Sequence, residues 1–153
     1  MINRHTMNWK IKAFDELTVQ ELYDVLQLRS EIFVVEQHCA YQDLDNADQK
    51  ALHLMGRNED GRLVAYTRLF APGIKYTEAS IGRVITSSLV RGSGAGRLLM
   101  EKSIAAVEEA YGKGPIKIGA QQYLHRFYTS LGFEQTSDTY MEDGIPHIEM
   151  VRP

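Results

Sequence analysis

The sequence predicts a mixed α/β (α+β) fold in which helices pack on one sheet. Short apolar runs typical of strands alternate along the chain with longer segments whose apolar residues recur at helical spacing. Two Asp-Gly pairs, Asp60-Gly61 and Asp143-Gly144, each lie between two strand-like runs, where they favour tight hairpin turns. Since a hairpin joins antiparallel strands, much of the sheet is expected to be antiparallel.

The first elements are predicted from periodicity and from capping. Residues 8–14 alternate between apolar and polar side chains, which predicts a strand whose apolar residues, including Ile11, face inward. The sequence Thr-Val-Gln-Glu at 18–21 is a capping box, in which the Thr oxygen accepts from the N3 amide while the Glu side chain reaches back. It begins a helix whose broad apolar face extends to about Phe33.

The later elements are separated by turn and capping residues. The polar, acidic stretch 36–50 is expected to be a loop or a short helix. Further strands are predicted at 51–57, 63–70, 78–85, 116–120, 134–141 and 146–151. Helices are predicted at 97–111 and 123–131, each of which is followed by a glycine.

Composition indicates one globular domain spanning residues 1–153. The residues are 44% hydrophobic and the net charge is −3, which argues against nucleic acid or an anionic membrane as a partner. The single cysteine, Cys39, cannot form an internal disulfide, the N-terminus lacks the apolar core of a signal peptide, and no apolar run approaches the roughly 18 residues that span a bilayer. We therefore expect a cytoplasmic protein.

The most informative stretch is the glycine-rich loop at residues 91–96, Arg-Gly-Ser-Gly-Ala-Gly. It follows the predicted strand at 78–85 and leads directly into the helix predicted at 97–111. A loop in this position points unpaired backbone N–H groups, at the positive end of a helix dipole, toward one spot. The loop therefore predicts a site for a phosphorylated cofactor.

The spacing of the glycines separates several kinds of phosphate loop. No Lys-Ser/Thr pair follows them, as a P-loop requires. A dinucleotide fold has G-x-G-x-x-G after the first strand, whereas here the spacing is G-x-G-x-G and three other strands precede the one that leads into the loop. A purely structural turn stays open as an alternative. The pattern that fits is R-x-x-G-x-G/A, formed by Arg91, Gly94 and Gly96.

With this pattern the chain resembles the GNAT superfamily of acyl-CoA N-acyltransferases over nearly its whole length. The segment from Gly119 to Phe133 resembles that family's second signature, with Gln121 where many members have asparagine. Other segments resemble its ElaA-like branch, namely 28–37, 41–45, 81–85 and 142–148. The resemblance implies a single GNAT domain with a mixed, mostly antiparallel sheet flanked by helices, in which one pair of parallel strands splays apart.

The resemblance also implies the reactants. Acetyl-CoA would be the acyl donor, a primary amine of a small molecule or protein would be the acceptor, and no metal would be needed. The loop would wrap the pyrophosphate of coenzyme A. The residues expected to contact the cofactor are Val84, Ile85, Arg91, Gly92, Ser93, Gly94, Ala95, Gly96, Arg97, Gln121, Phe127 and Tyr128.

Acyl transfer to an amine needs an oxyanion donor, an acid for the leaving thiolate and a base for the amine. The resemblance implies that the strand at 78–85 parts from the strand at 116–120 and leaves a backbone N–H free, so that of Val84 or Ile85 is the expected oxyanion donor. Tyr128 is the expected acid, because a phenol with a pKa near 10 is protonated at neutral pH. Glu36 and His147 are both candidates for the base, and a water chain to backbone carbonyls is a third.

Other polar residues are expected to play smaller parts. His53 lies in an apolar strand and is expected to be structural. Asp43, Asp45 and Asp48 lack the spacing of an EF-hand, so the stretch either attracts a cationic amine or is a solvated loop. Cys39 lacks a recognisable His/Asp arrangement and is expected to be a small buried hydrophobe rather than a nucleophile.

Two other functions stay open at this point. A non-catalytic module that binds or senses acyl-CoA would carry the same loop. An acyl-homoserine-lactone synthase would share the fold and an N-terminal Arg-x-x-[VI]-Phe motif, which residues 29–33 resemble. The complete R-x-x-G-x-G loop of this chain favours free coenzyme A as the donor instead. Related proteins often pair, so a homodimer is an arrangement that analogy suggests.

Overall fold

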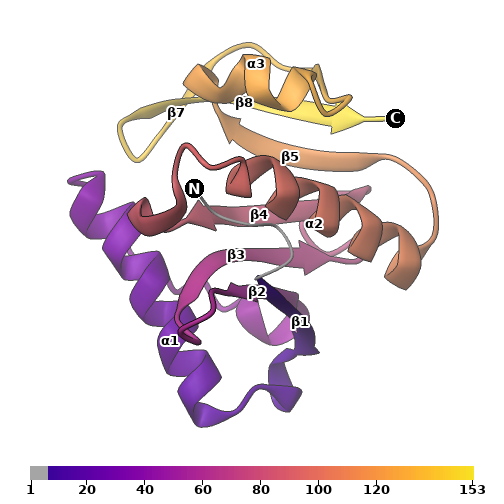
Figure 1. The fold of residues 1–153 in the computed structure, drawn as a ribbon. Helices are drawn as coiled ribbons and strands as arrows, with labels where there is room; N and C mark the ends of the chain where they lie inside the picture. Colours follow the sequence, from indigo (N-terminus) through magenta and orange to yellow (C-terminus); the bar gives the residue numbers. More distant parts are fainter. Residues whose placement is uncertain (1–6) are drawn as a thin grey trace.

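The computed structural model describes residues 7–153, which form one eight-stranded sheet with helices packed on it (Figure 1). The N-terminal segment in which no signal peptide was expected lies mostly outside these residues. The strands are β1 (Asn8–Ala13), β2 (Leu52–Arg57), β3 (Leu63–Phe70), β4 (Ala79–Thr86), β5 (Ile116–Gln121), β6 (Glu134–Gln135), β7 (Tyr140–Glu142) and β8 (Ile145–Arg152). The α-helices are α1 (Val19–Arg29), α2 (Ala95–Tyr111) and α3 (His125–Thr129).

The strand order is β1-β2-β3-β4-β5-β8-β6, and β7 pairs with β8. Each pairing is antiparallel except that of β4 with β5, which is parallel and joins only Ala79 to Ile116 and Ser80 to Lys117. Beyond these two pairs β4 and β5 separate, and Figure 1 shows β5 and β8 diverging from the rest of the sheet. The mostly antiparallel sheet with one splayed parallel pair is therefore confirmed.

The start of α1 and the two hairpins agree with the sequence. The Thr18 side chain accepts a hydrogen bond from the Glu21 amide at 3.0 Å, and Glu21 accepts one from the Thr18 amide at 2.9 Å, so the capping box is confirmed. In the β7–β8 turn, Asp143 has φ 51° and Gly144 has φ 76°. Both residues have the left-handed backbone conformation that a type I′ hairpin turn requires.

Three details differ from the predictions. The inward prediction for Ile11 is wrong: β1 is an edge strand, and the side chain is 46% exposed. The strand predicted at 134–141 is broken into β6 and β7, which both pair with β8. The helix predicted to run to about Phe33 ends its α-helical part at Arg29 and continues as a π-helical segment, Ser30–Glu36.

Strand β3 forms the centre of the core. All eight of its residues are buried. Clusters of buried hydrophobic residues pack against the sheet. One cluster includes Leu99 of α2, and another includes Val25 of α1. Within residues 7–153, no helix is both long enough and apolar enough to cross a membrane.

Candidate functional site

A cavity of about 860 Å³ lies where β4 and β5 separate. Its walls come from the π-helical segment, β4, the beginning of α2, the end of β5, α3 and the β7–β8 turn. The cavity brings together these residues predicted from the sequence: Glu36, Val84, Ile85, Arg91, Gly96, Gln121, Phe127, Tyr128 and His147. Other predicted residues of the loop lie outside its lining: Gly92, Ser93, Gly94, Ala95 and Arg97.

Strand β4 carries a bulge beside the cavity. Against β3, Gly82 pairs with Arg68 and Ile85 pairs with Tyr66, so three residue steps on β4 oppose two on β3. Arg83, inside the bulge, has φ 49°, a left-handed conformation that is uncommon for a residue with a side chain. Arg83 and Val84 have no partner on β3, whereas Ile85 is the first paired residue after the bulge. A residue left unpaired by a bulge can offer its backbone N–H to a ligand, as an oxyanion donor must.

The Arg83 side chain is held against the segment that follows the π-helix. Its Nε donates to Asp43 Oδ1 at 2.8 Å, and its Nη2 donates to the Asp43 carbonyl at 2.9 Å. The guanidinium carbon lies 6.0 Å from the centre of the Phe33 ring and 5.9 Å from that of Tyr41. The sequence predictions missed Arg83, although an arginine inside the apolar run 81–85 was a signal that could have revealed it.

The acidic stretch is an ion-pair network rather than a free negative surface. Arg29, which is wholly buried, donates from Nε to Asp43 Oδ2 at 2.9 Å and from Nη1 to Asp48 Oδ1 at 2.7 Å. Arg68, also buried, bonds both Asp45 and Asp48. Hydrogen bonds from Arg68 hold the pKa of Asp45 well below its usual value. Neither expectation for this stretch, an attraction for amines or a solvated loop, describes these carboxylates.

The glycine-rich loop has the shape of an anion cradle. Gly92 and Gly94 have φ of 77° and 86°, and no other heavy atom lies within 4 Å of where a Cβ would stand on either residue. Gly94 is the N-cap of α2, a helix of 17 residues, so the N–H groups of its first turn lie at the positive end of the helix dipole. These features fit a bound pyrophosphate.

Arg91, at the start of the loop, is paired with Glu36. Arg91 Nη1 lies 2.5 Å from Glu36 Oε1, and both side chains are 41% exposed. Arg91 Nη2 also donates to the carbonyl of Thr86, the last residue of β4, at 3.2 Å. A predicted cofactor contact and a candidate base are thus joined to each other.

Tyr128 lines the cavity and is only 4% exposed. Its ring makes edge-to-face contacts with Phe127 and Phe133, with ring centroids 5.1 and 5.8 Å away. Burial raises the pKa of its hydroxyl, which keeps the phenol protonated at neutral pH. Among residues 7–153 the hydroxyl has no hydrogen-bond partner, so it is available to a ligand.

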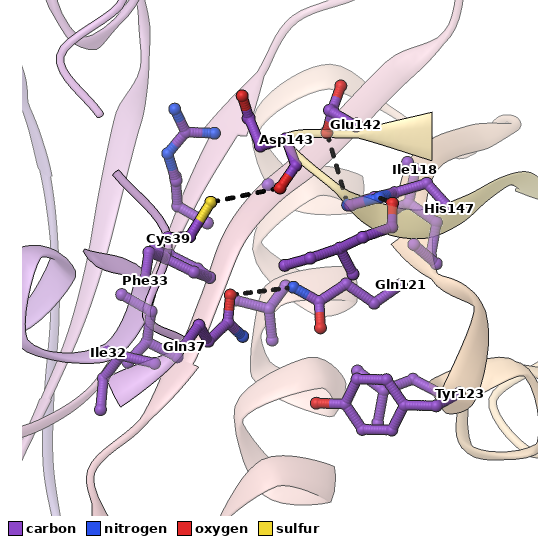
Figure 2. A pocket seen from close by; sticks show the side chains of 18 of the residues that line it. Ile32, Phe33, Gln37, Cys39, Ile118, Gln121, Tyr123, Glu142, Asp143 and His147 are labelled. Carbon is purple, nitrogen blue, oxygen red and sulfur yellow. Dashed lines mark hydrogen bonds and ion pairs between the residues drawn. The ribbon is translucent and has the colours of Figure 1, made fainter. Parts of the chain in front are cut away.

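His147 faces the cavity from β8 with a defined tautomer. Its Nδ1 lies 2.7 Å from the Ile145 carbonyl, and since a carbonyl only accepts, Nδ1 carries a proton. In the neutral ring Nε2 then has a free lone pair, and it lies 3.4 Å from Glu142 Oε2 (Figure 2). The ring also stacks on Tyr140. This arrangement can accept a proton at Nε2 and stabilise the resulting charge with Glu142.

Two polar contacts join the two walls of the cavity (Figure 2). Gln121 Nε2 donates to Gln37 Oε1 at 3.3 Å. The Cys39 thiol donates to the Asp143 carbonyl at 3.3 Å. Cys39 is half-buried and lines the cavity, so the expectation of a small buried hydrophobe is wrong.

His53 is structural, as predicted. It is buried, its Nε2 lies 2.9 Å from the Asp48 carbonyl, and its Nδ1 lies 2.6 Å from the Tyr66 hydroxyl. Burial lowers the pKa of the ring, which favours the neutral form. The carbonyl must accept, so Nε2 carries the proton and Nδ1 accepts from Tyr66.

Comparison with known proteins gives consistent matches along the chain. Residues 16–152 match the family model described as an acetyltransferase (GNAT) domain. Protein ElaA of Escherichia coli is 41% identical over 148 residues, which cover 95% of this chain and 96% of ElaA. The crystal structure of an acyl-CoA N-acyltransferase from Pseudomonas aeruginosa aligns with a TM-score of 0.91 at 42% identity, over 96% of this chain and 99% of that one. The AHL synthase LasI, at 12% identity and a TM-score of 0.75, shares the fold alone.

Proposed function

The chain belongs to the GNAT acetyltransferase family, and we propose that it is an N-acetyltransferase that transfers an acetyl group from acetyl-CoA directly to a primary amine. One observation carries this proposal. The cavity at the β4–β5 divergence is lined by Arg91 and Gly96, the two ends of the glycine-rich loop, and its walls carry a buried phenol and two groups that can accept a proton. A cavity of about 860 Å³ is within the range that binds small ligands.

The donor half of the proposed site is formed mainly by backbone. Bound acetyl-CoA would supply an electrophilic thioester carbonyl and the phosphate anions that anchor it. The N–H groups at the start of α2 would hold the pyrophosphate, together with Arg91. At the β4 bulge, the N–H of Val84 or Ile85 would donate to the thioester oxygen and stabilise the negative charge that develops there.

The remaining residues would carry out two proton transfers, one to the leaving sulfur and one from the amine. The Tyr128 hydroxyl has a raised pKa and no hydrogen-bond partner in the described part of the chain, and it would donate its proton to the departing sulfur. An alkylamine has a pKa near 10.4 and arrives mostly charged, so the acceptor must lose a proton before it attacks. His147 Nε2 and the Glu36 carboxylate, both on the cavity wall, are the candidate acceptors, and a water chain is the alternative.

The acceptor we propose is a free amine of a small molecule or of a protein. Glu142 and Asp143 line the cavity beside His147, and carboxylates favour a cationic amine. For the protein itself we propose a cytoplasmic location and the formation of homodimers, on the grounds given by the sequence.

The test measures the release of free coenzyme A thiol from acetyl-CoA with each amine of a panel, for the unmodified protein and for Tyr128→Phe. Turnover on at least one amine that falls in the variant is the expected result. Tight binding of coenzyme A with no turnover on any amine would instead indicate a sensor. A pH–rate profile of Glu36→Gln and of His147→Ala then identifies the base, because the acidic limb should disappear only in the variant that lacks it.

A further inference from the structure

We propose that the ion pair between Arg91 and Glu36 couples the two halves of the site. When phosphate occupies the glycine-rich loop, Arg91 turns from Glu36 to the phosphate, and the freed Glu36 carboxylate then receives the ammonium group of the acceptor. Bound donor therefore frees the negative charge that attracts the amine, and each ligand favours the binding of the other. This inference rests on the proposed function, in which the loop holds coenzyme A.

The first step is the position of the pair. Arg91 begins the loop that leads into α2, whereas Glu36 ends the π-helical segment, and both line the same cavity. Their contact at 2.5 Å joins the cradle for the donor to the opposite wall. Within residues 7–153, Glu36 has no other side-chain partner, so its charge is satisfied by Arg91 alone.

The second step is a comparison of the two anions. The Arg91–Glu36 pair is 41% exposed on each side, and exposed ion pairs are weak because water and salt screen them. A pyrophosphate carries more charge than one carboxylate, and it offers oxygens that suit the fork of a guanidinium. Arg91 is therefore expected to exchange Glu36 for phosphate when the donor binds, and Thr86 can keep its hydrogen bond to the same guanidinium.

The third step is the consequence for the acceptor. The aspartates near this wall are already neutralised, because Asp43 pairs with Arg29 and Arg83 and Asp45 pairs with Arg68. Glu36 is thus a carboxylate whose availability changes with the state of the donor loop. Linkage between sites is reciprocal, so a carboxylate that competes for Arg91 must also weaken the binding of the donor.

The experiment measures the dissociation constant of coenzyme A by calorimetry at fixed ionic strength. Glu36→Gln should bind coenzyme A roughly two- to five-fold more tightly than the unmodified protein, because the competing carboxylate is gone. Arg91→Gln should bind it more weakly while keeping the backbone cradle, and in that background Glu36→Gln should have no effect. Glu31→Gln removes an exposed charge from the same π-helical segment and should leave the affinity unchanged.

Each result bears on a different claim. Failure of the unmodified protein to bind coenzyme A would overturn the proposed function itself. Binding that Glu36→Gln leaves unchanged or weakens would overturn the coupling while the proposed function stands. Tightening that persists in the Arg91→Gln background would show long-range repulsion rather than the pair, and would also overturn it.

A kinetic measurement tests the coupling from the side of the acceptor. For an amine that turns over, its trimethylammonium counterpart keeps the charge but cannot be acylated. Because linkage is reciprocal, this analogue should bind roughly two- to five-fold more tightly to the complex with the donor than to the free protein, and so give mixed inhibition against acetyl-CoA with the smaller inhibition constant for the donor complex. Equal inhibition constants, or competitive inhibition, would contradict the inference.

Discussion

Replacing Tyr128 with phenylalanine should separate catalysis from folding. The hydroxyl has no hydrogen-bond partner among residues 7–153, so its removal breaks no protein hydrogen bond. The ring keeps its contacts with Phe127 and Phe133, and we expect the free energy of unfolding to change by less than about 1 kcal/mol. A general acid contributes about 10²- to 10⁴-fold to a rate, so kcat should fall by that factor, equivalent to about 3–5 kcal/mol of transition-state stabilisation.

Three measurements on the same protein decide this prediction. They are urea unfolding, the dissociation constant of coenzyme A, and kcat with an amine that turns over. The matched control is Tyr123→Phe, because Tyr123 also lines the cavity but is 75% exposed. An unchanged kcat in Tyr128→Phe, or a fall of equal size in Tyr123→Phe, would refute the role of the Tyr128 hydroxyl as the acid.

Other predictions concern the buried charges, the helix cap and the loop. Arg29→Met leaves the buried Asp48 and the half-buried Asp43 without this partner, and it should lower the free energy of unfolding, measured in urea, by about 3–5 kcal/mol. Arg57→Met, in a half-buried pair, should lower it by less than about 1 kcal/mol. Burial alone would raise the pKa of Glu21, but hydrogen bonds from Lys12 and the Thr18 backbone lower it to about 2. Its stabilisation is therefore complete above about pH 4.5 and lost as the pH falls toward about 2, and Glu21→Gln should flatten that part of a stability–pH curve. Gly94→Ala and Gly61→Ala, which replace glycines of similar φ, should each lower the free energy of unfolding by about 1 kcal/mol. Only Gly94→Ala should also weaken the binding of coenzyme A, because Gly61 lies in a distant hairpin.

The parts of the fold that follow from neighbouring residues could be predicted from the sequence. The capping box that begins α1 and the Asp-Gly turn between β7 and β8 each involve residues at most four apart. The end of α1 could not be predicted in the same way. Its apolar pattern continues past Arg29, but whether the backbone continues with α or π geometry depends on what the last turns pack against.

The candidate site was predictable in its donor half and not in its acceptor half. The donor half depends on a local pattern of glycines before a helix, which the sequence displays directly. The contacts of the acceptor half join residues far apart in the chain: Arg83 contacts Asp43, Arg91 contacts Glu36, and Cys39 contacts a residue 104 positions away. No local periodicity reports such pairs, because their spacing is set by the topology of the sheet.

The acidic stretch shows why a count of charges misleads about the acceptor. Three aspartates close together suggested a negative surface, but the folded chain neutralises each one with arginine. Among residues 7–153, the cavity is also lined by Glu142 and Asp143 of the β7–β8 hairpin and by Glu36, whose charge is shared with Arg91. The hairpin and Glu36 are far apart in the chain and line one cavity. Under the proposed coupling, attraction of the amine would depend on the glycine-rich loop, because that loop carries Arg91, the ion-pair partner of Glu36.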